Sequence, residues 1–426
     1  MRLGAVADDV TGACDLAGRV AEAGLPASVL LGTPSAPPAD VFPADGSGCA
    51  VVALKVRTAP VAEAVAASAA AARILASAGA TQLYQKYCST FDSTPAGNIG
   101  PIADALAAVA GTAGSVGTPA TPAARRTQYA GTLFVDGVPL AESPMRDHPL
   151  TPMRDSDLVR LLAPQTAAPV SLIRWEDVQR GPDAVAALVQ HGSHTLVDAL
   201  TEHDLDAIAA AILRRAADEP LLAAGGAGVA TALARAEVRE GVDATAADLA
   251  LPSVPVTGRL ILAGSASAAT RGQIAAFSGE RHILDPLDLA AGSAALDRVR
   301  DALAARDDRR VPVLVHASPD VASAHAALGA GRSAELLEEA LSGLALFAVH
   351  ELGYSHLIVA GGETSGAVTA RLGIDRLRIG AQAAPGVPWA VAASPGPEGD
   401  RTVAVLLKSG NFGGPGLFSD AWEVAP

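Results

Sequence analysis

Two polar clusters in the first half of the chain have residue types and spacing suited to chemistry on a polar ligand. In the first, GAVADDVTGACD, an apolar run ends in Asp8 and Asp9 and leads into Thr11 and Gly12. Ligands of open parallel sheets bind beyond the carboxyl ends of the strands, so these carboxylates are placed for a polar substrate. Thr11 and Gly12 could offer a hydroxyl and N–H groups to an anion at a helix start. Alternatively, Asp9 is only the cap of that helix.

The second cluster, QKYCSTFDSTPAGNIGP at 85–101, gathers one lysine, one aspartate and several hydroxyls in a loop that follows a strand. Its polar members are Lys86, Ser89, Thr90, Asp92, Ser93, Thr94 and Asn98. Such a loop suits a polyhydroxy ligand. Lys86 could hold a carboxylate or a phosphate, and Asp92 could accept a hydroxyl proton. The alternative is a turn stabilised by its Ser and Asp side chains.

The lysines are few and similarly placed. Lys55, Lys86 and Lys408 are the only lysines, and each ends an apolar run that is typical of a strand. A planar guanidinium cannot replace a compact ammonium where a point charge is needed, which favours a functional role for Lys86. For Lys55 and Lys408, function and chance explain the position equally well.

The second half contains glycine-rich turns that each follow a predicted strand. They are LILAGSAS around Ser265, LIVAGGETSG at 357–366 and LLKSGNFGG at 406–414. Glycines let backbone N–H groups approach a phosphate, and a helix start adds partial positive charge. Several such turns in one domain predict a nucleotide site, although the GxxxxGK[ST] motif is absent. GGAGVAT at 225–231 lacks the third glycine of a dinucleotide-binding turn and is a weak candidate.

The elements that must position these residues follow from hydrophobic patterning. Apolar runs alternate with Ala-rich helical stretches, which is typical of parallel-sheet α/β architecture. Strands are expected at 3–7, 51–54, 82–85, 170–173, 195–198, 259–263, 313–316, 356–360 and 403–407. Helices are expected at 13–23, 61–78, 101–110, 184–190 and 205–217. Irregular stretches at 112–126 and 142–154 are expected to be functional loops.

The length of 426 residues exceeds what one ordinary core supports. Periodicity is lost at 241–258, which contains Pro252 and Pro255. We therefore predict an α/β protein with two domains, at 1–240 and 259–426, joined by a linker at 241–258. Each domain should be a mainly parallel sheet flanked by helices.

Composition excludes several classes of function. The net charge of −14 disfavours nucleic-acid binding, which needs a basic surface. No apolar run is long enough to span a membrane, and Asp8 and Asp9 fall where a secretory signal would need an apolar core. The three cysteines have no CxxC spacing, so we expect neither a disulfide framework nor a cysteine-based zinc site. A cytoplasmic protein is expected, and a homo-oligomer is left open.

The motifs ADDVTGACD, KYCSTFDSTPAGNIGP, AGGETSGAV and LKSGNFGG together resemble the four-carbon acid sugar kinase family over essentially the whole chain. The form KYCSTFDST, with ALTEHDL and LAAGGAGVA downstream, is similar to members that act on 3-oxo-tetronate. Threonate and erythronate kinases usually carry a shorter K-x-DSTLRGN pattern. The resemblance implies an N-terminal sugar-acid domain, a C-terminal ATP domain and a ligand cleft between them. It also implies ATP and Mg²⁺ as cofactors and phosphorylation of the C4 hydroxyl.

The resemblance also implies roles for individual residues. The ATP contacts would be Ser265, Gly361, Gly362, Glu363, Thr364 and Gly410. The sugar-acid side would include Asp8, Asp9, Lys86, Asp92 and Asn98, to which we add Ser89, Arg57 and Arg126. Lys86 with Arg57 or Arg126 would hold the substrate carboxylate, and Asp92 or Asp9 would be the base. The metal ligands stay unassigned.

One loop departs from the family pattern. Where the family usually reads P-x-x-P-x-NGRT, this chain has PATPAARRT, so that Ala124 and Arg125 replace Asn and Gly. If the loop contacts substrate, the preference among four-carbon acids is affected, but the reaction class is not. Besides a threonate or erythronate kinase, two other functions are open. One is a nicotinamide-dependent sugar-acid oxidoreductase that uses 225–228. The other is a non-catalytic sugar-acid binding protein, against which the glycine turns argue.

Overall fold

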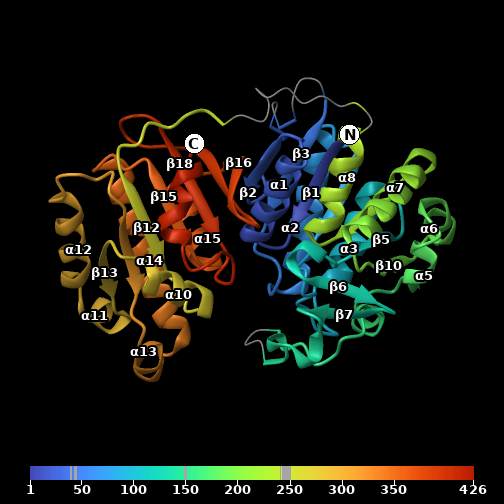
Figure 1. The fold of residues 1–426 in the computed structure, drawn as a ribbon, viewed down its shortest axis with the longest axis horizontal. Helices are drawn as coiled ribbons and strands as arrows, with labels where there is room; N and C mark the ends of the chain where they lie inside the picture. The colour runs from blue at the N-terminus through green and yellow to red at the C-terminus, as the bar shows by residue number, and fades with distance from the viewer. Residues whose placement is uncertain (39–40, 43–45, 148–150, 240, 242–250) are drawn as a thin grey trace. The chain divides into compact units, whose positions relative to one another are not determined.

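The computed structural model describes residues 1–38, 41–42, 46–147, 151–239, 241 and 251–426 (Figure 1). The chain divides into two compact units, Met1–Leu249 and Ala250–Pro426. Half of the predicted linker, residues 242–250, lies outside the described residues. No helix in the described ranges is both long and apolar enough to cross a bilayer.

The first unit is built on a parallel sheet with strand order β2-β3-β1-β4-β11-β5-β10-β9. Its strands are β1 (Arg2–Ala7), β2 (Ala27–Leu31), β3 (Gly48–Ala53), β4 (Gln82–Lys86), β5 (Ser115–Thr118), β9 (Val170–Ile173), β10 (His194–Val197) and β11 (Leu222–Gly225). The helices are α1 (Val10–Glu22), α2 (Val61–Ser77), α3 (Ile99–Ala110), α4 (Leu158–Leu162), α5 (Trp175–Val178), α6 (Pro182–Leu188), α7 (Glu202–Asp218) and α8 (Ala227–Arg239).

The direction of the crossovers decides where a ligand can bind in this unit. The connection from β1 through α1 runs toward β2, whereas the connection from β4 through α3 runs the other way, toward β5. Because such crossovers are right-handed, α1 and α3 cover opposite faces of the sheet. The carboxyl ends of β1 and β4 therefore border the kind of crevice in which open sheets bind ligands. We call this edge, where the parallel strands end, the carboxyl edge.

A small antiparallel sheet of β6 (Arg126–Tyr129), β7 (Thr132–Val135) and β8 (Val138–Pro139) is inserted after β5. It is preceded by a 3-10 turn, η1 (Pro122–Ala124). Further 3-10 turns in the first unit are η2 (Leu140–Glu142), η3 (Pro144–Asp147) and η4 (Ala163–Gln165). Leu133 and Val135 of β7 pack with Phe91, so this sheet shares a core with the loop after β4.

The second unit has strand order β13-β14-β12-β15-β18-β17-β16, parallel from β13 to β18 and antiparallel from β18 to β16. Its strands are β12 (Arg259–Ala263), β13 (Glu280–Leu284), β14 (Val313–Ala317), β15 (His356–Ala360), β16 (Arg376–Ala384), β17 (Val387–Ser394) and β18 (Arg401–Lys408). Its helices are α10 (Ala268–Ala276), α11 (Pro286–Ala291), α12 (Ala294–Ala304), α13 (Val321–Leu328), α14 (Ala330–His350), α15 (Gly362–Arg371), α16 (Leu417–Asp420) and η5 (Ala421–Val424). Trp389 and Phe418 are fully buried in its core.

The predicted fold class is confirmed, since mainly parallel sheets flanked by helices form both units. The prediction of an irregular stretch at 112–126 is wrong in part, because β5 and η1 lie within it. β5 has no apolar run because its backbone is pressed against β11: a Cβ at Gly117 would lie 1.7 Å from the carbonyl oxygen of Ala224. The sequence analysis also missed strands β2, β6, β7, β8, β11, β13, β16 and β17.

Candidate active site

Arg57, from the loop after β3, joins the carboxylates that follow β1. Its guanidinium donates from Nε to Asp8 Oδ2 at 2.8 Å and from Nη2 to Asp8 Oδ1 at 3.0 Å. Nη2 also lies 2.8 Å from Asp9 Oδ2, and Nη1 lies 3.8 Å from Asp92 Oδ2. Because β1 and β3 are adjacent and parallel, residues that follow them meet at the carboxyl edge. Arg57 is therefore occupied by protein carboxylates.

Asp8 and Asp9 have opposite pKa shifts. Burial raises the pKa of the Asp8 carboxyl, but the charge and hydrogen bonds of Arg57, helped by Lys86, outweigh it, so that the net pKa is lowered. For Asp9, burial and the neighbouring Asp8 charge outweigh Arg57 and Lys86, and the net pKa is raised. Asp9 is also the cap of α1, since its Oδ1 accepts from the Gly12 N–H at 2.5 Å. A raised pKa makes Asp9 the better proton acceptor of the two.

Lys86 ends β4 and is only 4% exposed. Its Nζ donates to the Tyr87 carbonyl oxygen at 2.9 Å. A Cβ added at Gly12 would lie 3.2 Å from that Nζ, so the ammonium lies at the start of α1, beside Asp9. Among the described residues, the Tyr87 carbonyl is its hydrogen-bond acceptor. An ammonium has three hydrogens, so a ligand oxygen can accept from the others.

The loop after Lys86 is shaped by a buried aromatic residue. Phe91 is fully buried and has a φ of 51°, in the left-handed region that costs an L-residue roughly 1–2 kcal/mol. Its ring contacts Tyr87 edge-to-face at 5.3 Å between centroids. Thr90 and Asp92 flank this residue, and Thr90 Oγ1 donates to Asp92 Oδ1 at 2.5 Å. The packing of Phe91 thus positions the Asp92 carboxylate.

Asn98 fixes the backbone of the segment that carries Arg57. Its Nδ2 donates to the carbonyl oxygens of Val56 at 2.7 Å and Ala59 at 2.8 Å, on either side of Arg57. These contacts are with protein backbone, so the described geometry gives Asn98 a positioning role. Ser89 is half-buried in the same loop.

One pocket at the carboxyl edge of the first unit collects most of the predicted substrate residues: Asp8, Arg57, Lys86, Asp92 and Asn98 all line it. Asp9, Ser89 and Arg126 are not among its lining residues. The pocket also includes Gln85 and Ser68, which the sequence analysis did not select. Gln85 Oε1 and Ser68 Oγ are buried and lack a hydrogen-bond partner among the described residues. Their signal in the sequence is a polar residue within an apolar strand and within an Ala-rich helix.

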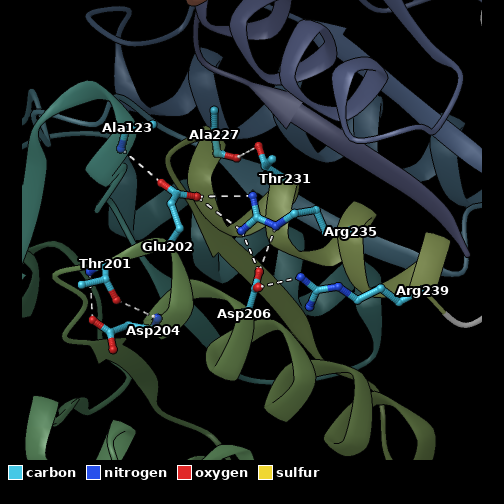
Figure 2. Close-up of polar contacts among 9 residues, drawn as sticks. All are labelled: Ala123, Thr201, Glu202, Asp204, Asp206, Ala227, Thr231, Arg235 and Arg239. Atoms are coloured by element: carbon cyan, nitrogen blue, oxygen red, sulfur yellow. Dashed lines mark hydrogen bonds and ion pairs between the residues drawn. The ribbon is translucent and has the colours of Figure 1, made fainter.

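The loop at 119–127, which departs from the family pattern, is held by α7 and α8. Figure 2 shows Glu202 of α7 accepting a hydrogen bond from the Ala123 N–H and facing Arg235 of α8. Arg235 also bonds Asp206, which pairs with Arg239. The GGAG turn that precedes α8 packs against the same loop: a Cβ at Gly226 would lie 2.7 Å from the Pro119 carbonyl oxygen. This packing accounts for the glycines that suggested a dinucleotide turn.

Arg125 and Arg126 differ in their surroundings. Arg125 has a φ of 59°, so it takes the left-handed backbone at the position where the family usually has glycine. Its side chain is exposed and pairs with Asp136 at 2.9 Å. Arg126 is half-buried, donates from Nη1 to the Ala124 carbonyl, and has a buried Nε with no partner in the described structure.

The glycine turns of the second unit come together at its carboxyl edge. The N–H groups of Gly264 and Ser265 donate to the Ala360 carbonyl at 3.0 and 3.2 Å, and the Gly361 N–H donates to the Lys408 carbonyl at 2.9 Å. The exits of β12, β15 and β18 are thereby tied together, and all the predicted ATP residues follow these strands: Ser265, Gly361, Gly362, Glu363, Thr364 and Gly410.

Glycine is required at several of these positions by close packing. A Cβ at Gly264 would lie 2.2 Å from Thr364 Oγ1, and one at Gly410 would lie 2.4 Å from Ser265 Oγ. Gly361 has a φ of 128°, which L side chains rarely adopt. Gly362 begins α15, and a Cβ there would meet no heavy atom within 4 Å. A helix N-terminus with open space beside it suits a phosphate.

Comparison with known proteins matches each half of the chain to a described domain family. A family model described as a sugar-binding N-terminal domain matches residues 3–233, and one described as a nucleotide-binding C-terminal domain matches residues 260–418. The fold and site thus define a two-domain enzyme with a sugar-binding and a nucleotide-binding part. The chain belongs to the four-carbon acid sugar kinase family, as the sequence motifs predicted.

Several curated relatives are similar over nearly their whole length. The 3-oxo-tetronate kinases of Pseudomonas fluorescens and Cupriavidus necator are 42% and 43% identical, each match covering 98% of this chain and 96% of the relative. The 3-oxo-tetronate kinase of Salmonella typhimurium is 37% identical, with 98% of both chains covered.

Solved structures show the same fold. A Salmonella typhimurium protein, described as a tRNA synthase, is 34% identical with a TM-score of 0.85, and a Haemophilus influenzae protein is 32% identical with a TM-score of 0.78. Both comparisons cover 100% of each chain.

Proposed function

We propose that this protein is an ATP-dependent kinase that transfers a phosphoryl group to the C4 hydroxyl of 3-oxo-tetronate. The observation that carries the proposal is the identity of 37–43%, over nearly the full length, to 3-oxo-tetronate kinases. A pocket that combines an ammonium with carboxylates at the carboxyl edge of the first unit suits a small hydroxy acid. A tRNA-directed activity is disfavoured by the net charge of −14.

On the sugar-acid side we assign the substrate carboxylate to Lys86, because its ammonium still has hydrogens to donate. Arg57 is committed to Asp8 and Asp9, so its proposed role is to orient these carboxylates. Asp9 is the proposed base that takes the proton of the C4 hydroxyl, since burial raises its pKa. Asp92 would orient the substrate from the adjoining loop. Arg126 stays a candidate contact because its Nε has no partner in the described structure.

On the nucleotide side, we propose that the turn residues Ser265, Gly361–Thr364 and Gly410 cradle the phosphates of ATP. The close packing that demands glycine at 264 and 410, with open space at Gly362, fits such a group. The proposed division is a sugar-acid domain at 1–240 and a nucleotide domain at 259–426.

For Mg²⁺, no cluster of three or more His, Cys, Asp or Glu suited to a metal occurs among the described residues. This fits an ion bound mainly by nucleotide phosphates, water and one or two carboxylates. Glu363, in the first turn of α15, is the proposed carboxylate. When bound, Mg²⁺ would neutralise charge on the transferred phosphoryl group.

A nicotinamide-dependent oxidoreductase is the weaker candidate. Its proposed turn at 225–228 is filled by the loop at 119–121, because a Cβ at Gly228 would lie 2.6 Å from the Ala120 carbonyl oxygen. We also propose a cytoplasmic location, where the cysteines, which form no disulfide, would stay reduced.

The test is a phosphorylation screen of purified protein with ATP and Mg²⁺ against 3-oxo-tetronate, threonate and erythronate, with the product position read by NMR. We expect the 4-phosphate of 3-oxo-tetronate. Turnover of threonate or erythronate in its place would overturn the substrate assignment. If no sugar acid is phosphorylated, the kinase proposal fails.

A further inference from the structure

Lys408 is the last residue of β18, directly before the glycine turn at 409–413, and its side chain is 0% exposed. Its Nζ donates to Thr270 Oγ1 at 2.8 Å, to Gln273 Oε1 at 2.9 Å and to the Gly410 carbonyl oxygen at 3.1 Å. All three hydrogens of the ammonium are therefore used within the protein. Lys408 differs in this respect from Lys86, whose ammonium has hydrogens left for a ligand.

The acceptors of Lys408 belong to two segments that are far apart in sequence. Thr270 and Gln273 lie on α10, which follows β12, whereas Gly410 follows β18. Gln273 Nε2 also donates to the carbonyls of Phe412 and Gly413, both at 3.0 Å, and Thr270 Oγ1 donates to the Gly410 carbonyl at 3.0 Å. This network fixes the turn at 409–413 against the start of α10.

The charge of Lys408 has no counter-charge. Its acceptors are a hydroxyl, an amide oxygen and a backbone carbonyl, and no carboxylate of the described residues forms an ion pair with it. Burying a charge costs free energy unless the charge is both hydrogen-bonded and paired with an opposite charge. Burial lowers the pKa of Lys408 to about 8, so it is still mostly charged at neutral pH. Phosphates of a bound nucleotide would supply the missing negative charge.

We propose that Lys408 is the positioning residue of the phosphate-binding turns, holding α10 and the turn at 409–413 together while its uncompensated charge favours a polyphosphate at the carboxyl edge of the second unit. The inference rests on the proposed function, because it assumes that these turns bind the phosphates of ATP. The chain has no GxxxxGK[ST] motif, whose lysine reaches the phosphates itself. Lys408 would act instead through Thr270, Gln273 and the Gly410 carbonyl, which shape the turns.

The test compares Lys408→Met with the wild type by titrating ADP and adenosine separately, each without a sugar acid. Methionine keeps most of the stem volume and removes the charge. We expect the Kd for ADP to rise about tenfold or more, the loss typical of a charge-assisted interaction, with the Kd for adenosine changed by less than about twofold. Equal losses for both ligands, or an unchanged Kd for ADP, would overturn the proposal.

Thr270→Val keeps the charge and removes one acceptor of Lys408, and it serves if Lys408→Met does not fold. ADP should then bind about three- to tenfold more weakly, with adenosine again unaffected, because the hydrogen bonds of Thr270 Oγ1 with Lys408 and with the Gly410 carbonyl are lost. Unchanged ADP binding by this variant would also contradict the proposal. Lys55→Met is the matched control, since Lys55 is an exposed lysine of the first unit, and its ADP affinity should equal that of the wild type.

These outcomes are distinct from failure of the proposed function. If the wild type binds ADP but phosphorylates no sugar acid, the kinase proposal fails and the role of Lys408 stands. If the wild type binds neither ADP nor ATP, the nucleotide site itself is wrong and the inference fails with it.

Discussion

Asp8 and Asp9 are neighbours in the chain, yet their environments separate their affinities for a proton. Arg57 donates two hydrogen bonds to Asp8, whereas Asp9 shares one arm of the guanidinium and is 29% exposed. Two adjacent carboxylates cannot both be stabilised fully by one cation, so the second keeps its proton to higher pH. This division of roles supports Asp9 as the base and Asp8 as the permanent anion.

The pH dependence of turnover should show this difference. The pKa of Asp9 is raised above 3.8. If turnover needs ionised Asp9, kcat should therefore begin to fall on acidification at a higher pH than it would with a base of ordinary aspartate pKa. Asp9→Asn should lower kcat roughly 100- to 10,000-fold, as expected for loss of a general base. The measurement is kcat against pH at saturating substrates. An acid limb at or below 3.8, or an active Asp9→Asn variant, would transfer the role to Asp92.

At the scale of elements, the loop that departs from the family pattern keeps its shape through its neighbours. The turn at Gly226, just before α8, packs against Pro119. Glu202, the first residue of α7, accepts a hydrogen bond from the Ala123 N–H. Arg125 therefore accepts a left-handed backbone, which costs an L-residue about 1–2 kcal/mol.

Restoring glycine at this position should stabilise the protein. Arg125→Gly removes the backbone strain and loses only an exposed ion pair with Asp136, which is worth little. We expect the free energy of unfolding in urea to rise by about 1 kcal/mol, with kcat/KM for the sugar acid unchanged. Arg146→Gly, at an exposed arginine of the same unit with ordinary backbone, is the control and should not stabilise. A loss of stability in Arg125→Gly would show that the ion pair outweighs the strain.

At the scale of the whole molecule, a chain with a net charge of −14 must bind two anionic ligands. We expect local cations to make this possible, since a buried lysine ends a strand in each unit, Lys86 in the first and Lys408 in the second. Burial strengthens the electrostatic attraction of each ammonium for an anion, because water and salt screen such an attraction at the surface.

If each unit binds one ligand, a single substitution should weaken the binding of ATP or of the sugar acid without affecting the other. Gly362→Val adds a side chain where the protein leaves space, so it should hinder phosphate while leaving the fold intact. We expect ATP to bind at least about tenfold more weakly and the sugar acid to bind as in the wild type. Lys86→Met should do the reverse, again by about tenfold or more.

Calorimetric titration of each ligand against each variant makes the measurement. Gly343→Val, at another glycine of the second unit whose Cβ would meet open space, is the matched control and should affect neither ligand. If Gly362→Val weakens the sugar acid and leaves ATP unchanged, the assignment of ligands to the units is inverted.

Local sequence determined the elements and motifs of this protein. Apolar runs such as 259–263 and 356–360 coincide with β12 and β15, because a strand buried on both faces must be apolar along its length. The rule that ligands bind at strand ends then located the polar residues after β1, β4, β12, β15 and β18. The short strands β5 and β11 escaped prediction, because their glycines serve a close contact between backbones rather than a side-chain pattern.

Only the tertiary structure decided which of these polar groups are available to a ligand. Arg57 was predicted as a substrate contact, but it meets Asp8 across 49 residues, and Lys408 meets Thr270 across 138. The left-handed backbone of Phe91 is likewise tolerated because its ring is packed by distant residues such as Leu133. Ion pairs, burial and strain of this kind depend on strand order, which residue types and spacing do not encode locally.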